Sequence, residues 1–248
     1  MICKSAKQTV LSLLVLFVMS LPLSAEKIVF SANRMTGQAG NTNTKTSLSG
    51  NAYVKTASME IQADELELSG DEYRYIKATG HIVGKNLEAN MDFTCDALEY
   101  DRTTKIAELR GNVKLTDLDN DVTAEAQIIT YNQQQDIAIL QIKIKLLQKD
   151  NVCSGAYAVY YKETQLLELS GNAQVTQNED TFRAQYITLN MKTQDITLDG
   201  NVKGKVTENA KKDESEEADE ASDDADSETE QASEGEDSEN DDGENNGN

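Results

Sequence analysis

The chain has 248 residues, of which 38% are hydrophobic and 27% charged, and its formal net charge is −21. This charge excludes a nucleic-acid binder as the first interpretation, because phosphate recognition needs a basic face. Residues 26–207 contain 25 acidic and 19 basic side chains, so this segment has nearly ordinary charge and is long enough for one domain with a sizeable core.

Residues 1–25 are expected to be a cleaved secretory signal peptide. Lys4 and Lys7 form a basic start, Val10 to Leu21 is almost wholly apolar, and Ser24-Ala25 supplies small residues before Glu26. The apolar run is short for a membrane span, although an uncleaved anchor remains an alternative. The sequence therefore predicts an exported, soluble mature protein.

A unit of about thirty residues recurs along residues 26–207. Its first element carries a Gly-Asn-like pair, found at Gly50-Asn51, Gly80-His81, Gly111-Asn112, Gly171-Asn172 and Gly200-Asn201, with a degenerate copy at Ile142-Lys143. Its second element recurs at Ala32-Asn33, Ala63-Asp64, Cys95-Asp96, Ala126-Gln127, Ala156-Tyr157 and Ala184-Gln185. The unit is thus present in about six copies.

Both elements alternate small or apolar residues with polar ones, which is typical of β-strands. The second element also changes phase, because Met59, Ile61 and Ala63 are followed by Leu66 and Leu68. A step of three in a two-residue period predicts a bulge and a bend at the Ala-Asp position.

The fold prediction is an all-β protein, an elongated antiparallel β-jelly roll of about six two-strand repeats. Turn-like segments such as Asp101 to Lys105 and Asn132 to Asp136 favour hairpins. A parallel β-helix with a thirty-residue coil is the alternative. Six strands in each sheet would span about 29 Å.

Residues 208–248 form an acidic tail with 19 acidic residues and two lysines. Such a composition cannot bury enough apolar surface to offset the ordering entropy, so we expect a disordered tail. It is either a solubilising extension or a segment that binds calcium ions or a basic partner. No EF-hand spacing occurs in it.

Enzyme signatures are absent from the sequence, and no cofactor or metal site is predicted. His81 is the only histidine, which leaves no histidine triad or histidine metal cluster to build. Asp64 and Asp96 recur with the repeat and are replaced by Gln127 and Gln185, which indicates a structural role at the bulge.

Two further expectations concern small side chains. The repeated glycines are expected on the apolar face, where they either permit a bend or leave room for a long apolar ligand. Cys95 is expected on the apolar face and Cys153 on the opposite one, so a disulfide between them is disfavoured although export permits one.

The repeats resemble the OstA-like domain of the lipopolysaccharide-transport proteins of the LptA family. The matching segments are Leu48-Ser49-Gly50-Asn51-Ala52-Tyr53-Val54 with Met59 to Leu66, then Leu109 to Leu115 with Val122 to Tyr131, and Leu169 to Val175. The resemblance covers about Lys27 to Val206, and the acidic tail and the near absence of proline depart from the family pattern.

The resemblance implies a periplasmic bridge protein that holds lipid acyl chains between its sheets and carries lipopolysaccharide, or a related envelope glycolipid, from the inner to the outer membrane. It implies head-to-tail self-association and partners with OstA-like domains in the inner- and outer-membrane components LptC and LptD. Alternatives are a ligand-free scaffold, an enzyme acting on envelope polymers, and a membrane-anchored component similar to LptC.

Shared phase in successive copies predicts the residues that contact lipid. They are Ile61, Ala63, Leu66, Phe93, Leu98, Tyr100, Val113, Ile129 and Tyr131. The first and last copies must present unpaired strand edges, around Ile28 to Met35 and Asn201 to Val206, which carry no proline to block pairing. The residues expected at these oligomer edges are Ile28, Val29, Phe30, Val202 and Val206.

Overall fold

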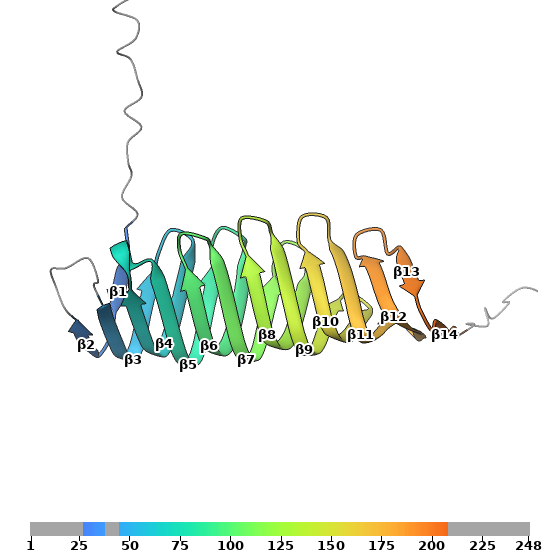
Figure 1. Ribbon diagram of the computed structural model, residues 1–248, viewed down its shortest axis with the longest axis horizontal. Helices are drawn as coiled ribbons and strands as arrows, with labels where there is room; N and C mark the ends of the chain where they lie inside the picture. Colours follow the sequence, from blue (N-terminus) through green and yellow to red (C-terminus); the bar gives the residue numbers. More distant parts are fainter. Residues whose placement is uncertain (1–26, 38–44, 208–248) are drawn as a thin grey trace, which may run out of the picture. The chain divides into compact units, whose positions relative to one another are not determined.

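The computed structural model describes residues 27–37 and 45–207 (Figure 1). The predicted signal peptide and acidic tail lie outside these residues. The regular elements of the described residues are fourteen strands and one short 3₁₀ turn, η1 (Asp71–Tyr73), which confirms the all-β prediction. The strands are β1 (Val29–Ser31), β2 (Arg34–Gly37), β3 (Lys45–Lys55), β4 (Met59–Ser69), β5 (Tyr75–Asn86), β6 (Met91–Asp101), β7 (Ile106–Asp117), β8 (Val122–Asn132), β9 (Ile137–Gln148), β10 (Asn151–Tyr161), β11 (Leu166–Gln177), β12 (Asp180–Asn190), β13 (Ile196–Asp199) and β14 (Lys203–Lys205).

All fourteen strands belong to one antiparallel sheet, in which β3 to β13 follow one another in chain order. Short strands cover its ends: β1 and β2 both pair with β3, and β13 and β14 both pair with β12. The antiparallel pairing excludes the β-helix alternative and confirms the jelly-roll prediction. No helix among the described residues has the length and apolarity needed to cross a bilayer.

The sheet is folded over on itself along its length. β6 has eleven residues, which would span about 36 Å if straight. Yet Lys105, which follows β6, places its Nζ 2.7 Å from Oε2 of Glu88, which precedes it. Each long strand therefore bends at its middle and contributes one half to each of two facing leaves.

The bends lie where the register of every long strand pair shifts. At the bend, successive buried residues are separated by three residues in β5, Thr79 to His81, but by only two in β6, Asp96 and Ala97. The predicted bend at the Ala-Asp position is confirmed, but the bulge is on the neighbouring strand, because the extra residue lies in the Gly-Asn-like pair of the odd-numbered strands. Both members of that pair have positive φ, 73° at Gly111 and 45° at Asn112.

The expectation that the repeated glycines face the apolar interior is wrong. Gly111 is in the left-handed region, and a Cβ there would collide with the Asp96 carboxylate on the neighbouring strand. Similarly, a Cβ on Gly80 would meet Asp64. The glycines thus serve the bend, where left-handed backbone and a close side chain both disfavour larger residues.

The core is a single apolar cluster between the two leaves, and it extends from β3 to β12. Cys95 and Cys153 are free and both are buried in it, so the expectation that Cys153 faces outward is wrong. The reason is the repeat register, because Ala156 packs against Gly171 as Asp64 packs against Gly80. Gly155, rather than Ala156, therefore corresponds to Ala63.

The turns that join the strands form two rows, which lie along the upper edge of Figure 1. Row one consists of residues 56–58, 87–90, 118–121, 149–150 and 178–179, and row two consists of residues 70–74, 102–105, 133–136, 162–165 and 191–195. Backbone hydrogen bonds stack turns within a row, such as Leu118 N to Asn90 O at 3.1 Å and Lys162 N to Asp136 O at 2.9 Å. We call the line between the two rows the seam.

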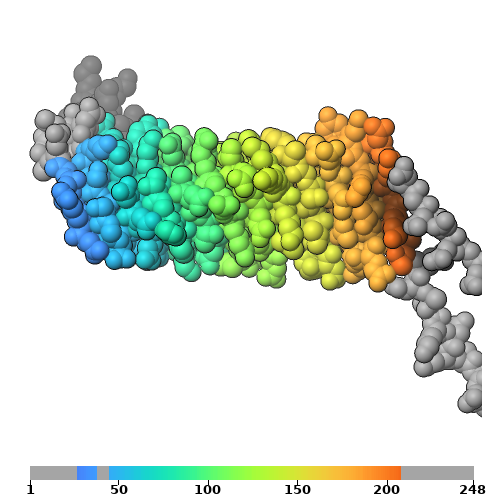
Figure 2. Space-filling model, turned by 90° about the horizontal axis from the view of Figure 1, so that it is seen from below, coloured from blue at the N-terminus to red at the C-terminus, as the bar shows by residue number. Residues whose placement is uncertain are grey.

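Every long strand crosses both leaves, so the strands stack in single file (Figure 2). The sheet order runs from β1 directly to β3 and then to β13, which makes twelve strands in a row. They span about 53 Å at the usual spacing between strands. The expected length of about 29 Å was wrong, because it divided the strands between two separate sheets.

Candidate functional site

The interior between the leaves is the candidate lipid-binding site. All nine residues predicted to contact lipid lie in its single core cluster, with exposed fractions of 0–4%. Neighbouring positions of opposite phase, such as Gln62 and Thr94, are exposed. The structure therefore brings the predicted residues together in one interior, and contact with lipid remains a prediction.

Protein side chains fill this interior closely. Phe93 pairs with Gly84 across β5 and β6, and a Cβ on Gly84 would overlap the Phe93 ring. Ile61 and Ile129 are fully buried. A lipid chain therefore needs the two leaves, or these side chains, to move.

Three tyrosines carry polar groups from the interior to the seam. Tyr100, Tyr131 and Tyr160 occupy the same repeat position, two residues after Leu98, Ile129 and Ala158. The Tyr100 hydroxyl lies 2.9 Å from Ser58 Oγ across the seam. The Tyr131 hydroxyl donates to Asp136 at 2.5 Å within row two, and the Tyr160 hydroxyl donates to Asp117 across the seam at 3.0 Å.

A buried ion pair lies at the middle of the seam. Lys162 Nζ, in row two, is 3.1 Å from Asp117 Oδ1 and 2.7 Å from Asp119 Oδ2, both near row one. The side chains of Lys162 and Asp117 are 10% and 2% exposed. Asn120 Nδ2 donates to Asp117 Oδ2 at 2.8 Å and contacts Tyr160 Oη at 3.3 Å.

The titration of this cluster follows its geometry. Burial alone would lower the pKa of Lys162, but hydrogen bonds to Asp119 and Asp117 and their charges outweigh burial and raise it. Burial, together with Asp117, raises the pKa of the Tyr160 hydroxyl. Lys162 is therefore charged and Tyr160 neutral at physiological pH.

Other contacts cross the seam on either side of this cluster. Glu88 in row one accepts hydrogen bonds from Lys105 at 2.7 Å and from Gln133, both in row two. Near the C-terminal end, Gln194 Oε1 in row two accepts from Asn151 Nδ2 at 2.5 Å and from Gln177 Nε2 at 3.2 Å. The seam is thus closed by polar side chains along the described sheet.

The predicted oligomer edges lie at the two ends of the sheet. Val29 and Phe30 belong to β1, with Val29 exposed and Phe30 and Ile28 packed partly against the core. Val202 and Val206 flank β14 and are exposed. These residues thus lie at the ends of the described sheet, and their role as oligomer edges remains a prediction.

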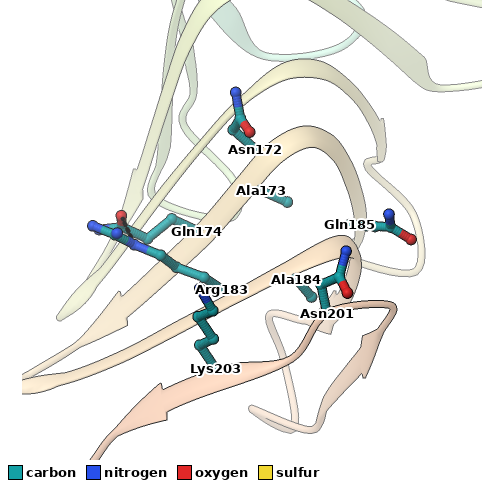
Figure 3. A pocket seen from close by; sticks show the side chains of 8 residues that line it. All are labelled: Asn172, Ala173, Gln174, Arg183, Ala184, Gln185, Asn201 and Lys203. Atoms are coloured by element: carbon teal, nitrogen blue, oxygen red, sulfur yellow. Dashed lines mark hydrogen bonds between the residues drawn. The ribbon is translucent and has the colours of Figure 1, made fainter.

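A polar pocket opens beside the bend at the C-terminal end (Figure 3). Arg183 and Lys203 line it together with Asn172, Gln174, Gln185 and Asn201, and no acidic side chain from the described part of the chain contributes. Arg183 Nε donates to Gln174 Oε1 at 2.8 Å. Its walls can accept an anionic group, and sequence reasoning did not identify it.

No group of three or more metal-ligating side chains occurs among residues 27–37 and 45–207. His81 is exposed at the bend, and its Nδ1 lies 2.7 Å from Asp64 Oδ2. Asn112 Nδ2 likewise donates to Asp96 Oδ2 at 2.9 Å. These aspartates stabilise the bend by holding the residue after each glycine, in agreement with their predicted structural role.

The cluster at Lys162 was missed because its charged residues lie in turns or at the end of a strand, where the alternating pattern does not indicate side-chain contacts. A signal existed in the repeat, since tyrosine replaces the leucine of Leu68 and Leu189 in three internal copies. A buried tyrosine usually hydrogen-bonds through its hydroxyl, which would have pointed to polar partners near the strand ends.

Comparison with known proteins gives one family and several chains of solved structures. A family described as "LptA/(LptD N-terminal domain) LPS transport protein" matches residues 31–165 and 133–195, which together span two thirds of the chain. Among curated proteins, none matches. Of 17 matching chains of solved structures, one is LptH from Pseudomonas aeruginosa, described as the LptA homologous periplasmic component of the lipopolysaccharide transport device. It is 16% identical with a TM-score of 0.45, and the match covers 49% of this chain and 97% of that one.

Proposed function

Since the chain belongs to the LptA/(LptD N-terminal domain) family of LPS transport proteins, we propose that it is a periplasmic lipid-binding bridge protein. It carries lipopolysaccharide, or a related envelope glycolipid, from the inner towards the outer membrane. The observation that carries this proposal is the apolar interior, which continues without interruption from β3 to β12. Burial of acyl chains contributes about 0.8 kcal/mol per methylene, so affinity does not require a charged anchor.

Photo-crosslinking tests the interior as the lipid site. A photo-reactive residue at Ile61 or Phe93, both buried, should capture lipid in the native envelope. The same residue at Gln62 or Thr94, one step away on the exposed face, should not. Equal capture at both phases would contradict the site.

One molecule supplies about 53 Å of stacked strands. A bridge longer than this requires molecules to associate through the ends of their sheets. An edge-to-edge contact between unlike ends is heterologous and propagates as an open filament. Head-to-tail copies, or OstA-like domains of LptC- and LptD-type partners, fit these ends. A proline at Val29 or Val206 should abolish concentration-dependent oligomers in sedimentation while the monomer stays folded. A strict monomer that binds no partner domain would favour a soluble lipid carrier.

A ligand-free scaffold is the second candidate, and the filled interior favours it. The nine residues predicted to contact lipid are no more than 4% exposed, because protein side chains cover them. Lipid extraction and mass spectrometry of the protein from its native envelope separate the two functions. A scaffold yields no co-purifying glycolipid. The intact mass from the same sample shows whether residues 1–25 are removed or retained as an anchor.

A further inference from the structure

The folded sheet has only one long edge at which its leaves can separate. Along the bends the leaves are joined by the continuous backbone of every long strand. Along the seam, each contact described above involves side chains, such as Lys162 with Asp117 and Glu88 with Lys105. Asn120 Nδ2 also donates to the backbone oxygen of Lys162 at 3.4 Å. Any separation of the leaves is therefore a rotation about the bends that opens the seam.

Acyl chains need such a separation, because the interior is already filled. Phe93 lies against Gly84, and Ile61, Leu98 and Ile129 are at most 1% exposed. Interiors this well packed do not accept an added chain without movement of their walls. Opening of the seam provides the room and also a path to the interior along the whole sheet.

The contacts across the seam differ in strength. Glu88 and Lys105 are well exposed, and exposed ion pairs contribute little. Ser58 with Tyr100 is a neutral hydrogen bond, as is Gln194 with Asn151. Lys162 with Asp117 is the buried ion pair among the described contacts across the seam, and Tyr160 and Asn120 hold Asp117 in place.

We propose that the seam is a lateral opening through which acyl chains reach the interior, and that Lys162, with Asp117 and Asp119, is the latch that keeps it closed. The proposal rests on the proposed lipid-binding function and adds how the lipid gains access. The lipid-binding residues themselves are unchanged by it.

Charge suits a latch of this kind. Closed, the ammonium and carboxylate are hydrogen-bonded to each other and to Asp119, Tyr160 and Asn120. Open, both ions regain water, so the desolvation cost of the closed state is returned. An unpaired carboxylate at Asp117 should therefore drive the seam open, whereas a neutral pair at the same place should keep it closed.

Uptake kinetics test the latch. The probe is lipopolysaccharide labelled on an acyl chain with a fluorophore, mixed with the full chain in a stopped-flow instrument. Lys162→Met should raise the association rate at least fivefold. Lys162→Met combined with Asp117→Asn should return it to within twofold of the parent rate. Lys77→Met is the matched control, because Lys77 pairs with Glu99 at 2.9 Å on the exposed face.

A reversible cross-link across the seam tests the lateral opening even if Lys162→Met folds poorly. Cysteines at Glu88 and Gln133, whose side chains touch across the seam, are joined by a short bismaleimide with a reducible centre in a Cys3→Ser background. Native Cys95 and Cys153 are buried with pKa raised to about 12, so they do not compete. The cross-link should slow uptake at least tenfold, and reduction should restore it.

The outcomes separate this inference from the function on which it rests. Uptake by the locked protein at the parent rate would overturn the lateral opening and place access at the sheet ends. An unchanged rate in Lys162→Met with a normal melting curve would overturn the latch. No uptake by any variant, including reduced and unlocked protein, would overturn the proposed lipid binding and the inference with it.

Discussion

The two long edges of the folded sheet are closed by different means. At the bends, nearly every odd-numbered strand repeats one backbone solution, a left-handed glycine followed by a left-handed polar residue. At the seam, the contacts differ along the sheet, from a neutral Ser58–Tyr100 pair to the Lys162–Asp117 ion pair. Backbone conformation thus repeats because each strand must bend in the same way, whereas side chains at the seam vary because several polar pairs can close it.

Of the substitutions at the two edges, removal of the ion pair at the seam should lower the free energy of unfolding most. Lys162→Met should lower the free energy of unfolding by about 3 kcal/mol, because it leaves the Asp117 carboxylate buried without its counter-charge. Urea denaturation measures the loss, and Lys77→Met on the exposed face should cost less than about 1 kcal/mol.

The double variant Lys162→Met, Asp117→Asn completes this cycle. It should recover more than half of the loss, because a neutral amide is cheaper to bury than a lone carboxylate. Additive losses from the two substitutions would show that the pair does not act as a unit.

The bends should respond somewhat less strongly. Gly111→Ala should cost about 2 kcal/mol, because alanine disfavours φ of 73° and its Cβ meets the Asp96 carboxylate. Gly204→Ala is the control, since that glycine lies outside the left-handed region and its added Cβ makes ordinary contacts at 3.5 Å. Similar losses at both positions would contradict the conformational argument.

Loss of one tyrosine hydroxyl at the seam should destabilise the protein less than the substitution at the bend. Tyr100→Phe removes the partner of Ser58 Oγ and should cost about 1 kcal/mol, a typical value for one hydrogen bond. Tyr157→Phe on the exposed face should change stability by less than about 0.5 kcal/mol. The seam contact is dispensable if both substitutions give the same midpoint in urea.

The smallest effect concerns the bend at His81. The hydrogen bond to Asp64, and then its charge, raises the pKa of His81 above its ordinary value. Its contribution to stability is therefore complete below the ordinary histidine pKa and is lost as pH rises through the raised one. NMR titration should show the raised pKa, and Asp64→Asn should lower it towards the ordinary value. An unshifted pKa in the parent protein would mean that the contact is absent in solution.

Sequence periodicity was sufficient to predict the bend but not the contacts across the seam. The step from Ala63 to Leu66 predicted a bulge, because an alternating strand keeps its apolar residues on one face across such a step only if a residue is bulged out. It did not show that the glycines have positive φ, since a two-residue pattern says which face a residue occupies only while the strand is extended. The same ambiguity misplaced Cys153, because Gly155, rather than Ala156, occupies the repeat position of Ala63 in β10.

The interior residues could be predicted and the latch could not. Phe93, Leu98 and Ile129 follow a local rule that each copy repeats. Lys162 lies in a turn of row two and Asp117 is the last residue of β7, beside row one. They are separated by 45 positions, so their contact depends on how far the sheet folds over. No pattern within one repeat contains that information, although the recurring tyrosines at positions 100, 131 and 160 marked the side of the sheet where polar partners were needed.

The number of repeats determines the length of the domain. Each unit of about thirty residues adds two strands in single file, or about 10 Å of length. Deletion of one whole unit, such as residues 106–136, keeps every bend in phase and every turn in its row, whereas deletion of half a unit joins a strand to the wrong leaf. The length of the sheet can therefore change only in steps of one repeat.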